Sequence, residues 1–213
     1  MHCGLVQGES KLELIIASNN KGKIKEIKQI LSDINIQVFS LQDKNIDIDV
    51  EENGKTFAEN AKIKAVEIVK FLKSKGEEDF YVLSDDSGLC VDYLGGEPGV
   101  YSARYAGEHG NDKLNNEKLL KNLEGVEEKE RSARFVCSMA LVNENLECRA
   151  VEGYVEGRIL TEALGVGGFG YDPLFFCNEL NKGFGITDSI EKNKVSHRGN
   201  ALKKLKQLLE EIL

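Results

Sequence analysis

The sequence predicts an α/β fold built around a central mixed β-sheet with flanking helices. In the first part of the chain, apolar runs of strand length alternate with amphipathic segments of helical spacing, which indicates parallel β-α units. Later, two apolar runs are separated only by the polar turn N-E-N at 143–145, which predicts an antiparallel hairpin. A sheet that contains both kinds of strand pairing is mixed.

Length and composition fit one folded unit that is not a general nucleic-acid binder. The chain has 213 residues, with 28 Lys and Arg against 36 Asp and Glu, and a formal net charge of −8. A protein that binds duplex nucleic acid needs a basic face, and this balance argues against one. We expect residues 1–10 to be a disordered leader and residues 11–213 to form a single domain with two lobes.

The N-terminus and the cysteines predict a cytoplasmic protein without a membrane partner. No charged segment followed by an apolar run opens the chain, and no stretch approaches the length of a membrane span. The five cysteines form no C-x-x-C pair and have no zinc-site spacing. A reducing compartment is therefore expected.

The first elements are predicted from periodicity and caps. A buried strand at 12–17 runs into a polar loop at 18–23, and a helix with apolar residues at 24, 27, 30 and 31 follows. A second strand is expected at 36–39, and an alternating stretch from 46 ends in an acidic turn by 54. Thr56 and Glu59 form a capping box that opens a long helix. Its expected buried stripe is Ala58, Ala61, Ala65, Ile68 and Leu72.

Two adjacent acids, Asp85 and Asp86, follow the apolar run at 81–83. The pair Ser87-Gly88 favours a tight turn, so we expect a second short strand at 89–94 and a rigid loop at 95–99. Because successive strand side chains point to opposite faces, the two acids are expected to do different jobs, one in a cleft and one bracing the turn.

The second half of the chain predicts a helix, a hairpin and a closing helix. The helix begins at Asn111, a plausible N-cap, and reaches 123, with a glycine stop at 125. The hairpin strand at 135–142 returns through 148 to 155, and a mobile glycine-rich approach is expected at 156–168. A buried strand at 174–177 and a polar segment precede the amphipathic C-terminal helix.

Each polar stretch taken alone has an ordinary interpretation. A strand, a loop with Lys21 and Lys23, and a helix start make an anion site, although a simple capped helix is equally compatible and the Walker A pattern is absent. Paired acids suit Mg²⁺, but Asp-Asp-Ser-Gly is also a common solvated turn. Lys64 fits a phosphate contact and a surface lysine equally well.

Together these stretches describe one ligand, a nucleotide with its polyphosphate. Lysines suit the phosphates, carboxylates suit Mg²⁺, and an aromatic residue after glycines suits a stacked base. The chain resembles the inosine triphosphate pyrophosphatase family, also called the Ham1 family, from about residue 12 to the C-terminal helix. The motifs that carry the resemblance are S-N-N-K-G-K, E-E-N-G-K-T-F-A-E-N-A, S-D-D-S-G-L, G-G-x-P-G-x-Y-S-A-R-Y, G-G-F-G-Y-D-P and E-K-N-x-x-S-H-R.

The resemblance implies an elongated two-lobed fold with a cleft between the lobes, a homodimer, and hydrolysis of ITP, dITP and XTP to the monophosphate and pyrophosphate. It implies that Glu51 and Asp86 hold Mg²⁺ and that Asp86 accepts a proton from water. The nucleotide would be bound by Ser18, Asn19, Asn20, Lys21, Gly22, Lys23, Lys64, Ser87, Phe169, Gly170, Tyr171, Asp172, Lys192, His197 and Arg198.

Two other interpretations stay open at this point. A non-enzymatic nucleotide sensor would need the lysines and the aromatic residue but not Glu51 and Asp86. The Maf-like pyrophosphatases share the overall layout, whereas the S-H-R and F-G-Y-D stretches favour the purine enzymes. Arg198, which has only donors, is expected to face the 6-carbonyl of hypoxanthine or xanthine and to reject the amino group of adenine.

Overall fold

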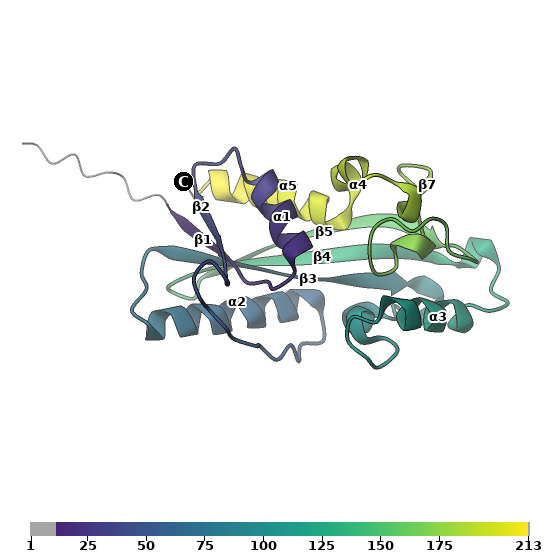
Figure 1. Ribbon diagram of the computed structural model, residues 1–213, viewed down its shortest axis with the longest axis horizontal. Coiled ribbons are helices and arrows are strands. Elements are labelled where there is room, and N and C mark those ends of the chain that lie inside the picture. Colours follow the sequence, from purple (N-terminus) through teal and green to yellow (C-terminus); the bar gives the residue numbers. More distant parts are fainter. Residues whose placement is uncertain (1–11, 213) are drawn as a thin grey trace, which may run out of the picture.

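The computed structural model describes residues 12–212 and contains one seven-stranded mixed sheet with helices on both faces (Figure 1). The strand order is β2-β1-β3-β4-β5-β6-β7; β1 runs parallel to β2 and β3, and the remaining neighbours are antiparallel. The predicted fold class is therefore confirmed, and the predicted leader at 1–10 lies outside the described residues. The strands are β1 (Glu13–Ile16), β2 (Gln37–Ser40), β3 (Phe80–Val91), β4 (Ser132–Asn143), β5 (Cys148–Ile159), β6 (Phe175–Cys177) and β7 (Lys182–Gly183).

The helices cover the two faces of this elongated sheet (Figure 1). In that view α2 and α3 lie below the sheet, and α1, α4 and α5 lie above it. Across residues 12–212, no helix combines the length and the apolar character needed to cross a bilayer. The helices are α1 (Lys21–Ile30), α2 (Phe57–Ser74), α3 (Asp112–Asn122), α4 (Ser189–Val195) and α5 (His197–Glu210).

Alternation along β1 and β3 supplies the core on both faces of the sheet. Ile15 and Val82 pack on the α2 side with Ala61, Ala65 and Ile68, and all five side chains are buried. Leu14, Ile16 and Leu83 face the other way, toward apolar residues of α1 and α5. A third cluster includes residues of α3 and β6 and is centred on the rings of Phe135, Phe175 and Phe184.

Side-chain caps fix where the helices begin. Thr56 Oγ1 accepts the Glu59 N–H at 3.1 Å, as the capping box predicts, but the Glu59 carboxylate bonds the N–H of Lys55 rather than that of Thr56. Asn111 accepts the Leu114 N–H at 3.1 Å and opens α3, as predicted. Ser196 caps α5, so this helix begins at His197 and includes residues assigned to a polar segment.

The predicted turn at Ser87-Gly88 is wrong. β3 continues unbroken through all four residues of the Asp-Asp-Ser-Gly motif, and Ser87 and Gly88 pair with Cys137 and Val136 of β4. Turn propensity is local, and a long antiparallel ladder outweighs it here. Gly88 serves close packing instead, because a Cβ at this position would lie 2.7 Å from the carbonyl oxygen of Gly99.

Smaller differences have equally local causes. Ala58 is exposed and Phe57 is buried in its place, because Phe57 lies four residues before Ala61 and shares its face of α2. The strand expected at 89–94 ends at Val91 and gives way to a 3₁₀ helix, Asp92–Leu94. Residues 156–159, assigned to the glycine-rich approach, belong to β5. The alternating stretch at 46–50 joins no strand of the described sheet.

We expect Gly88→Ala to lower the free energy of unfolding by about 1–3 kcal/mol, the usual cost of overpacking a filled site. The added methyl group would collide with the Gly99 carbonyl and with the Phe57 ring, 2.9 Å away. Urea denaturation measures the change. Cys90→Ala, two residues further along the same face of β3, adds no atom and serves as the control; equal midpoints for the two variants would show that Gly88 has room for a side chain.

Candidate functional site

A cavity of about 1020 Å³ brings together most of the sequence-predicted site residues. It lies between the β1–α1 loop, the 48–52 loop and α2 on one side, and the segments around 100–112, 169–172 and 192–198 on the other. The predicted residues that line it are Ser18, Asn19, Asn20, Gly22, Lys23, Glu51, Lys64, Asp86, Ser87, Phe169, Gly170, Tyr171, Asp172, Lys192, His197 and Arg198.

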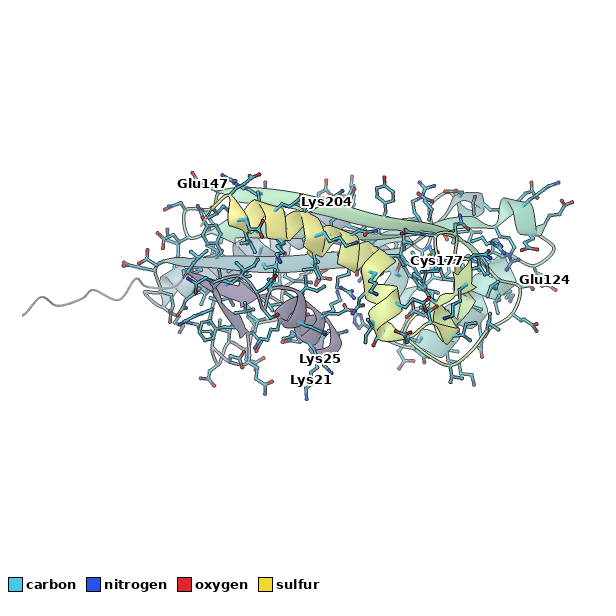
Figure 2. All side chains as sticks on the ribbon, turned by 90° about the horizontal axis from the view of Figure 1, so that it is seen from above. Lys21, Lys25, Glu124, Glu147, Cys177 and Lys204 are labelled. Atoms are coloured by element: carbon cyan, nitrogen blue, oxygen red, sulfur yellow. The ribbon has the colours of Figure 1, made fainter. Side chains whose placement is uncertain are left out.

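Lys21 is the one predicted binding residue that does not line this cavity. Figure 2 shows Lys21 and Lys25 projecting outward from α1 at the edge of the molecule. Helical residues two positions apart point in nearly opposite directions, so a helix that turns Lys23 inward turns Lys21 outward. The side chain of Lys21 therefore lies away from the cavity, and the binding role expected for this residue stays a prediction.

Asn20 organises the loop that precedes α1. Its Oδ1 accepts the N–H groups of Gly22 at 2.9 Å and Lys23 at 3.1 Å, and its own N–H donates to Ser18 Oγ at 3.2 Å. Two amide groups at the helix start are thus already satisfied by the cap. The loop attracts an anion through the other N–H groups at the start of α1 and through the positive charge of Lys23.

Asp85 is buried and belongs to a charge network below the cavity. Its Oδ2 lies 2.8 Å from Lys23 Nζ and 3.7 Å from Arg198 Nε, and the side chain is only 2% exposed. Burial by itself raises the pKa of Asp85, but the positive charges of Lys23 and Arg198 outweigh burial and hold the pKa below its usual value. Asp85 is therefore ionised and holds two helices to β3.

Asp86, the next residue, faces the cavity instead. Its Oδ2 accepts from Asn60 Nδ2 at 3.0 Å and its Oδ1 accepts the Ser87 N–H at 2.9 Å. Burial raises the pKa of Asp86, the Asn60 hydrogen bond opposes that rise, and the charge of Glu52 adds to it. The carboxylate is thus held in place by neutral donors and made more basic than an exposed aspartate.

Asn60 joins Asp86 to the acidic loop, a link that the sequence interpretation did not assign. This side chain is 2% exposed, and its Oδ1 accepts the Gly54 N–H at 2.8 Å while its Nδ2 donates to Asp86. In the same loop Glu52 pairs with Lys64 at 2.6 Å, and Lys64 Nζ also reaches the Asp85 carbonyl oxygen at 3.4 Å. The signal available in the sequence was spacing: Asn60 lies four residues before Lys64 and therefore on the same face of α2 as that predicted site residue.

Two carboxylates of the cavity wall could hold a divalent cation. Glu51 and Asp86 both line the cavity, and carboxylate oxygens are the ligands that Mg²⁺ prefers. Within residues 12–212 no cluster of three or more potential ligands is present. This donor set fits Mg²⁺, which needs only one or two protein carboxylates when water and substrate oxygens complete its shell.

The other end of the cavity presents an aromatic face with a lysine beside it. The side chain of Phe169 is 54% exposed, and its ring centroid lies 4.9 Å from Lys192 Nζ. Lys192 is held by Asp172 at 2.5 Å. Tyr171 is nearly buried and its hydroxyl donates to the Ser102 carbonyl oxygen at 2.8 Å, so this phenol supports the fold rather than facing a ligand.

His197 and Arg198 complete this end from the start of α5. The His197 ring stacks on Phe135 with centroids 5.0 Å apart, and its buried Nδ1 has no partner among the described residues. Burial, together with the charges of Arg198 and Lys192, holds the pKa of His197 well below its usual value. The imidazole is therefore neutral and can serve as a donor or an acceptor.

Arg198 is less free than the sequence interpretation assumed. Its Nη1 donates to Glu26 at 2.9 Å, its Nη2 reaches Ser87 Oγ at 3.4 Å, and its Nε faces Asp85. The guanidinium also lies 5.9 Å from the Phe169 ring. Two carboxylates thus hold Arg198 in place, and Glu26 is a site residue that no motif indicated.

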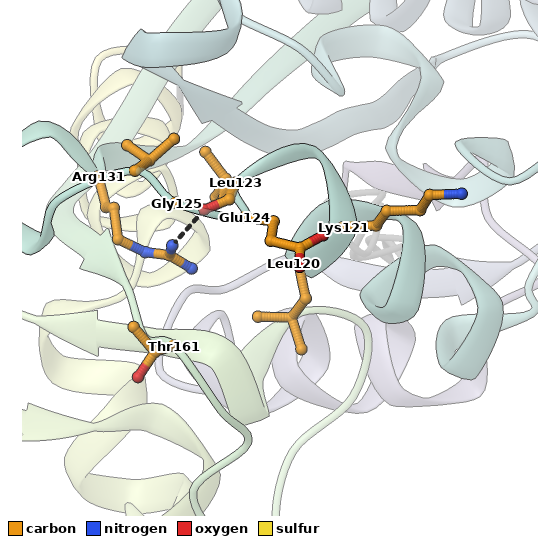
Figure 3. A pocket seen from close by; sticks show the side chains of 8 residues that line it. Leu120, Lys121, Leu123, Glu124, Gly125, Arg131 and Thr161 are labelled. Carbon is orange, nitrogen blue, oxygen red and sulfur yellow. Dashed lines mark hydrogen bonds between the residues drawn. The ribbon is translucent and has the colours of Figure 1, made fainter.

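A second, smaller hollow of about 400 Å³ lies between the end of α3 and Thr161 (Figure 3). Arg131 reaches into it but already donates to the carbonyl oxygens of Leu123, Ile159 and Leu160, each at 2.8 Å. Three of its five N–H groups are therefore used by backbone carbonyls, which anchor the guanidinium in the fold. This hollow lacks the combination of acids, lysines and an aromatic face that marks the larger cavity.

Several known proteins are similar to this chain over nearly its whole length. The model of the Ham1 family matches residues 14–208. The dITP/XTP pyrophosphatase of Clostridium perfringens is 57% identical over 201 residues, 94% of this chain and 98% of that protein. That of Bacillus subtilis is 48% identical over 198 residues, 93% of this chain and 97% of that protein.

Solved structures give the same result. The Ham1 protein of Staphylococcus aureus superposes with a TM-score of 0.84 at 41% identity, covering 94% of this chain and 100% of that one. A nucleoside-triphosphatase, dITP/XTP pyrophosphatase, of Mycobacterium abscessus has a TM-score of 0.74 at 38% identity, covering 91% and 98%.

The low pKa of His197 predicts a loss of stability on mild acidification. Below about pH 6.5, the usual histidine value, the unfolded chain takes up a proton at His197 that the folded protein does not, so the free energy of unfolding falls as the pH falls. The slope from this one group is at most about 1.4 kcal/mol per pH unit. His197→Phe keeps a ring against Phe135 and should flatten the curve between pH 6.5 and 5.

Urea denaturation at a series of pH values measures that slope. His109→Gln, at an exposed position on the cavity rim, is the control and should keep the parental dependence. A parental slope in His197→Phe would mean that another group causes the acid sensitivity.

Proposed function

Because this chain belongs to the Ham1 family, it is a pyrophosphatase that acts on the non-standard purine nucleotides dITP and XTP, and we propose that Asp86 and the cavity around it carry out the reaction. Family membership decides against the Maf-like alternative. The observation that supports the proposed site is that a single cavity of about 1020 Å³ has an acid-and-lysine end and an aromatic end. A nucleoside triphosphate has two ends that complement these: a charged triphosphate, which binds lysines and a metal ion, and an aromatic base, which stacks on a ring.

We propose that the triphosphate lies over the β1–α1 loop and the base lies against Phe169. Lys23 and Lys64 provide positive charge at the first end, where Asn20 shapes the loop. Phe169, which is 54% exposed, offers its ring for stacking at the other end, where the Lys192 ammonium lies over the ring at 4.9 Å from its centroid.

We propose that Glu51 and Asp86 would hold Mg²⁺ at the phosphate end. When bound, Mg²⁺ supplies positive charge that offsets the charge developing on the phosphate oxygens. The side chains of the protein prepare for this role: Asn60 holds Asp86 and the acidic loop in one arrangement, and Lys64 neutralises the neighbouring Glu52.

The proposed chemistry is hydrolysis between the α- and β-phosphates. A water molecule attacks the α-phosphorus, its proton passes to Asp86, and pyrophosphate leaves while the monophosphate stays bound at the base end. The raised pKa of Asp86 suits a proton acceptor, and two neutral hydrogen bonds keep its carboxylate aimed into the cavity. Asp85 cannot take this role, because it is buried between two cations.

We propose that the base is selected by hydrogen-bond donors on side chains whose orientation is fixed by other contacts. Lys192 is fixed by Asp172, and His197 is fixed by stacking on Phe135. Donors held in this way pair with the 6-carbonyl of hypoxanthine or xanthine and meet the amino group of adenine donor to donor. A mismatch of this kind rejects the wrong base by up to about 10⁴-fold. Arg198, the donor expected from the sequence to face the 6-carbonyl, stays part of the proposal: its guanidinium lies 5.9 Å from the Phe169 ring and is oriented by Glu26.

A panel of nucleoside triphosphates assayed for pyrophosphate release tests the function. With Mg²⁺ present, ITP, dITP and XTP are expected to be good substrates and ATP a very poor one. A nucleotide sensor would bind these compounds without releasing pyrophosphate. Equal rates for ITP and ATP would contradict the proposed base selection.

Asp86→Asn should lower kcat for dITP at least about 10²-fold, the lower limit for loss of a general base. The amide keeps the shape of the side chain but loses the charge needed by a metal ion and a proton. Asp85→Asn is the matched control at the adjacent position: it should reduce thermal stability, because Lys23 and Arg198 lose their shared partner, and reduce kcat much less. A parental kcat for Asp86→Asn would remove it from the mechanism.

Assembly and location also belong to this proposal. We infer a homodimer in the cytoplasm, where free thiols such as Cys137 and Cys177 remain reduced. Light scattering at micromolar concentration distinguishes a dimer from a monomer.

A further inference from the structure

The backbone around Phe169 is held by hydrogen bonds although the ring itself is exposed. The N–H of Phe169 donates to Asp172 Oδ2 at 2.9 Å, and its carbonyl oxygen accepts the Asp172 N–H at 3.2 Å. The next peptide groups are bound as well: the N–H of Gly170 donates to Asp112 Oδ2 at 2.7 Å, and its carbonyl oxygen accepts from Asn116 Nδ2 at 2.9 Å. All four backbone polar groups of these two residues therefore have partners.

Asp112 and Asn116 come from α3, more than 50 residues away in sequence, with separations of 58 and 54. Residues four apart lie one above the other on the same face of a helix, so α3 presents an acceptor and a donor together. A peptide group needs this combination, an acceptor for its N–H and a donor for its carbonyl. Within residues 12–212 the bond to Gly170 is the only hydrogen bond of the Asn116 side chain, and its buried Oδ1 has no partner.

The conformation of this loop depends on the glycines on both sides of Phe169. Gly168 has φ +77° and Gly170 has φ +59°, a left-handed region that other residues adopt only with strain. Glycines permit this shape but do not enforce it, since they also populate other conformations freely. The hydrogen bonds from α3 and from Asp172 hold the loop in the one conformation that the glycines permit but do not enforce.

We propose that Asp112 and Asn116 are positioning residues that fix Phe169 as the stacking platform for the purine base. The proposal rests on the base lying against Phe169, as proposed above. Preorganising a loop in its bound conformation improves affinity because less ordering remains to be done on binding. The effect is confined to the base end, since Lys23, Lys64 and Asp86 make no hydrogen bond or ion pair with α3.

Binding of the two products separates this role from a general structural one. Inosine monophosphate carries the base, and pyrophosphate carries only phosphates. Isothermal titration calorimetry with each product, on full-length protein, should show that Asp112→Ala and Asn116→Ala weaken inosine monophosphate binding about 10-fold each, within the energy that stacking of one base provides. Pyrophosphate binding should stay within about 2-fold of the parental value.

Two further variants make the result specific. Asp112→Asn keeps an oxygen acceptor for the Gly170 N–H, and it should restore most of the affinity lost in Asp112→Ala. Asn115→Ala is the matched control, because Asn115 neighbours Asn116 on α3 and also makes two hydrogen bonds to backbone, to Ala106 N–H at 2.7 Å and Ala103 O at 3.3 Å. It contacts no group of Gly170 and should leave the ratio of the two affinities unchanged.

The outcomes are distinguishable. Equal losses for both products in Asp112→Ala and Asn116→Ala, or a parental affinity for inosine monophosphate, would overturn the positioning role. The positioning role would also be overturned if Asn115→Ala changed the ratio of the inosine monophosphate and pyrophosphate affinities as strongly as Asn116→Ala does. Failure of the parental protein to bind either product would instead count against the proposed function of the cavity.

Discussion

The buried carboxylate of Asp85 is the point on which the arrangement of the cavity depends. A charge with 2% exposure is tolerated only when it is paired, and its two partners come from opposite ends of the chain, Lys23 on α1 and Arg198 on α5. Glu26 closes the network from α1 to Arg198. Ion pairs with Asp85 of the central strand therefore join the first and last helices beside the cavity, which Lys23 and Arg198 line.

This use of Asp85 leaves Asp86 free to face the cavity. Successive strand residues point to opposite faces, so two adjacent acids can be separated completely when the strand stays straight. β3 does so because it pairs with β4 on both sides of the motif, and Gly88 lets the 3₁₀ helix Gly99–Arg104 approach. One acid has its pKa lowered by cations and the other has its pKa raised by burial, although they are neighbours.

Sequence reasoning predicted the features that depend on local signals. Strand and helix order and the Thr56 and Asn111 caps follow from patterns within a few positions. The gathering of most motif residues at one cavity was expected only from the family resemblance, because no local pattern brings distant stretches together. Features set by distant partners were missed: the ladder that removes the turn at Ser87, and the bond from Asn60 to Asp86 across 26 residues. That Lys21 points away from the cavity was not foreseen, because the direction of a helical side chain depends on how the helix packs.

Selectivity among nucleoside triphosphates has to arise at the base end, because the phosphates are common to all of them. Flexible donors there would turn away from an adenine amino group and lose little. In the proposed site, a donor fixed by its own ion pair, such as Lys192 against Asp172, cannot do so, and the mismatch leaves both groups without a hydrogen-bond partner. Rigidity at Phe169 has the same consequence, since a base held in one plane cannot shift to avoid the mismatch. In the proposed base site, the hydrogen bonds that hold this end of the cavity therefore contribute to discrimination alongside the groups that touch the base.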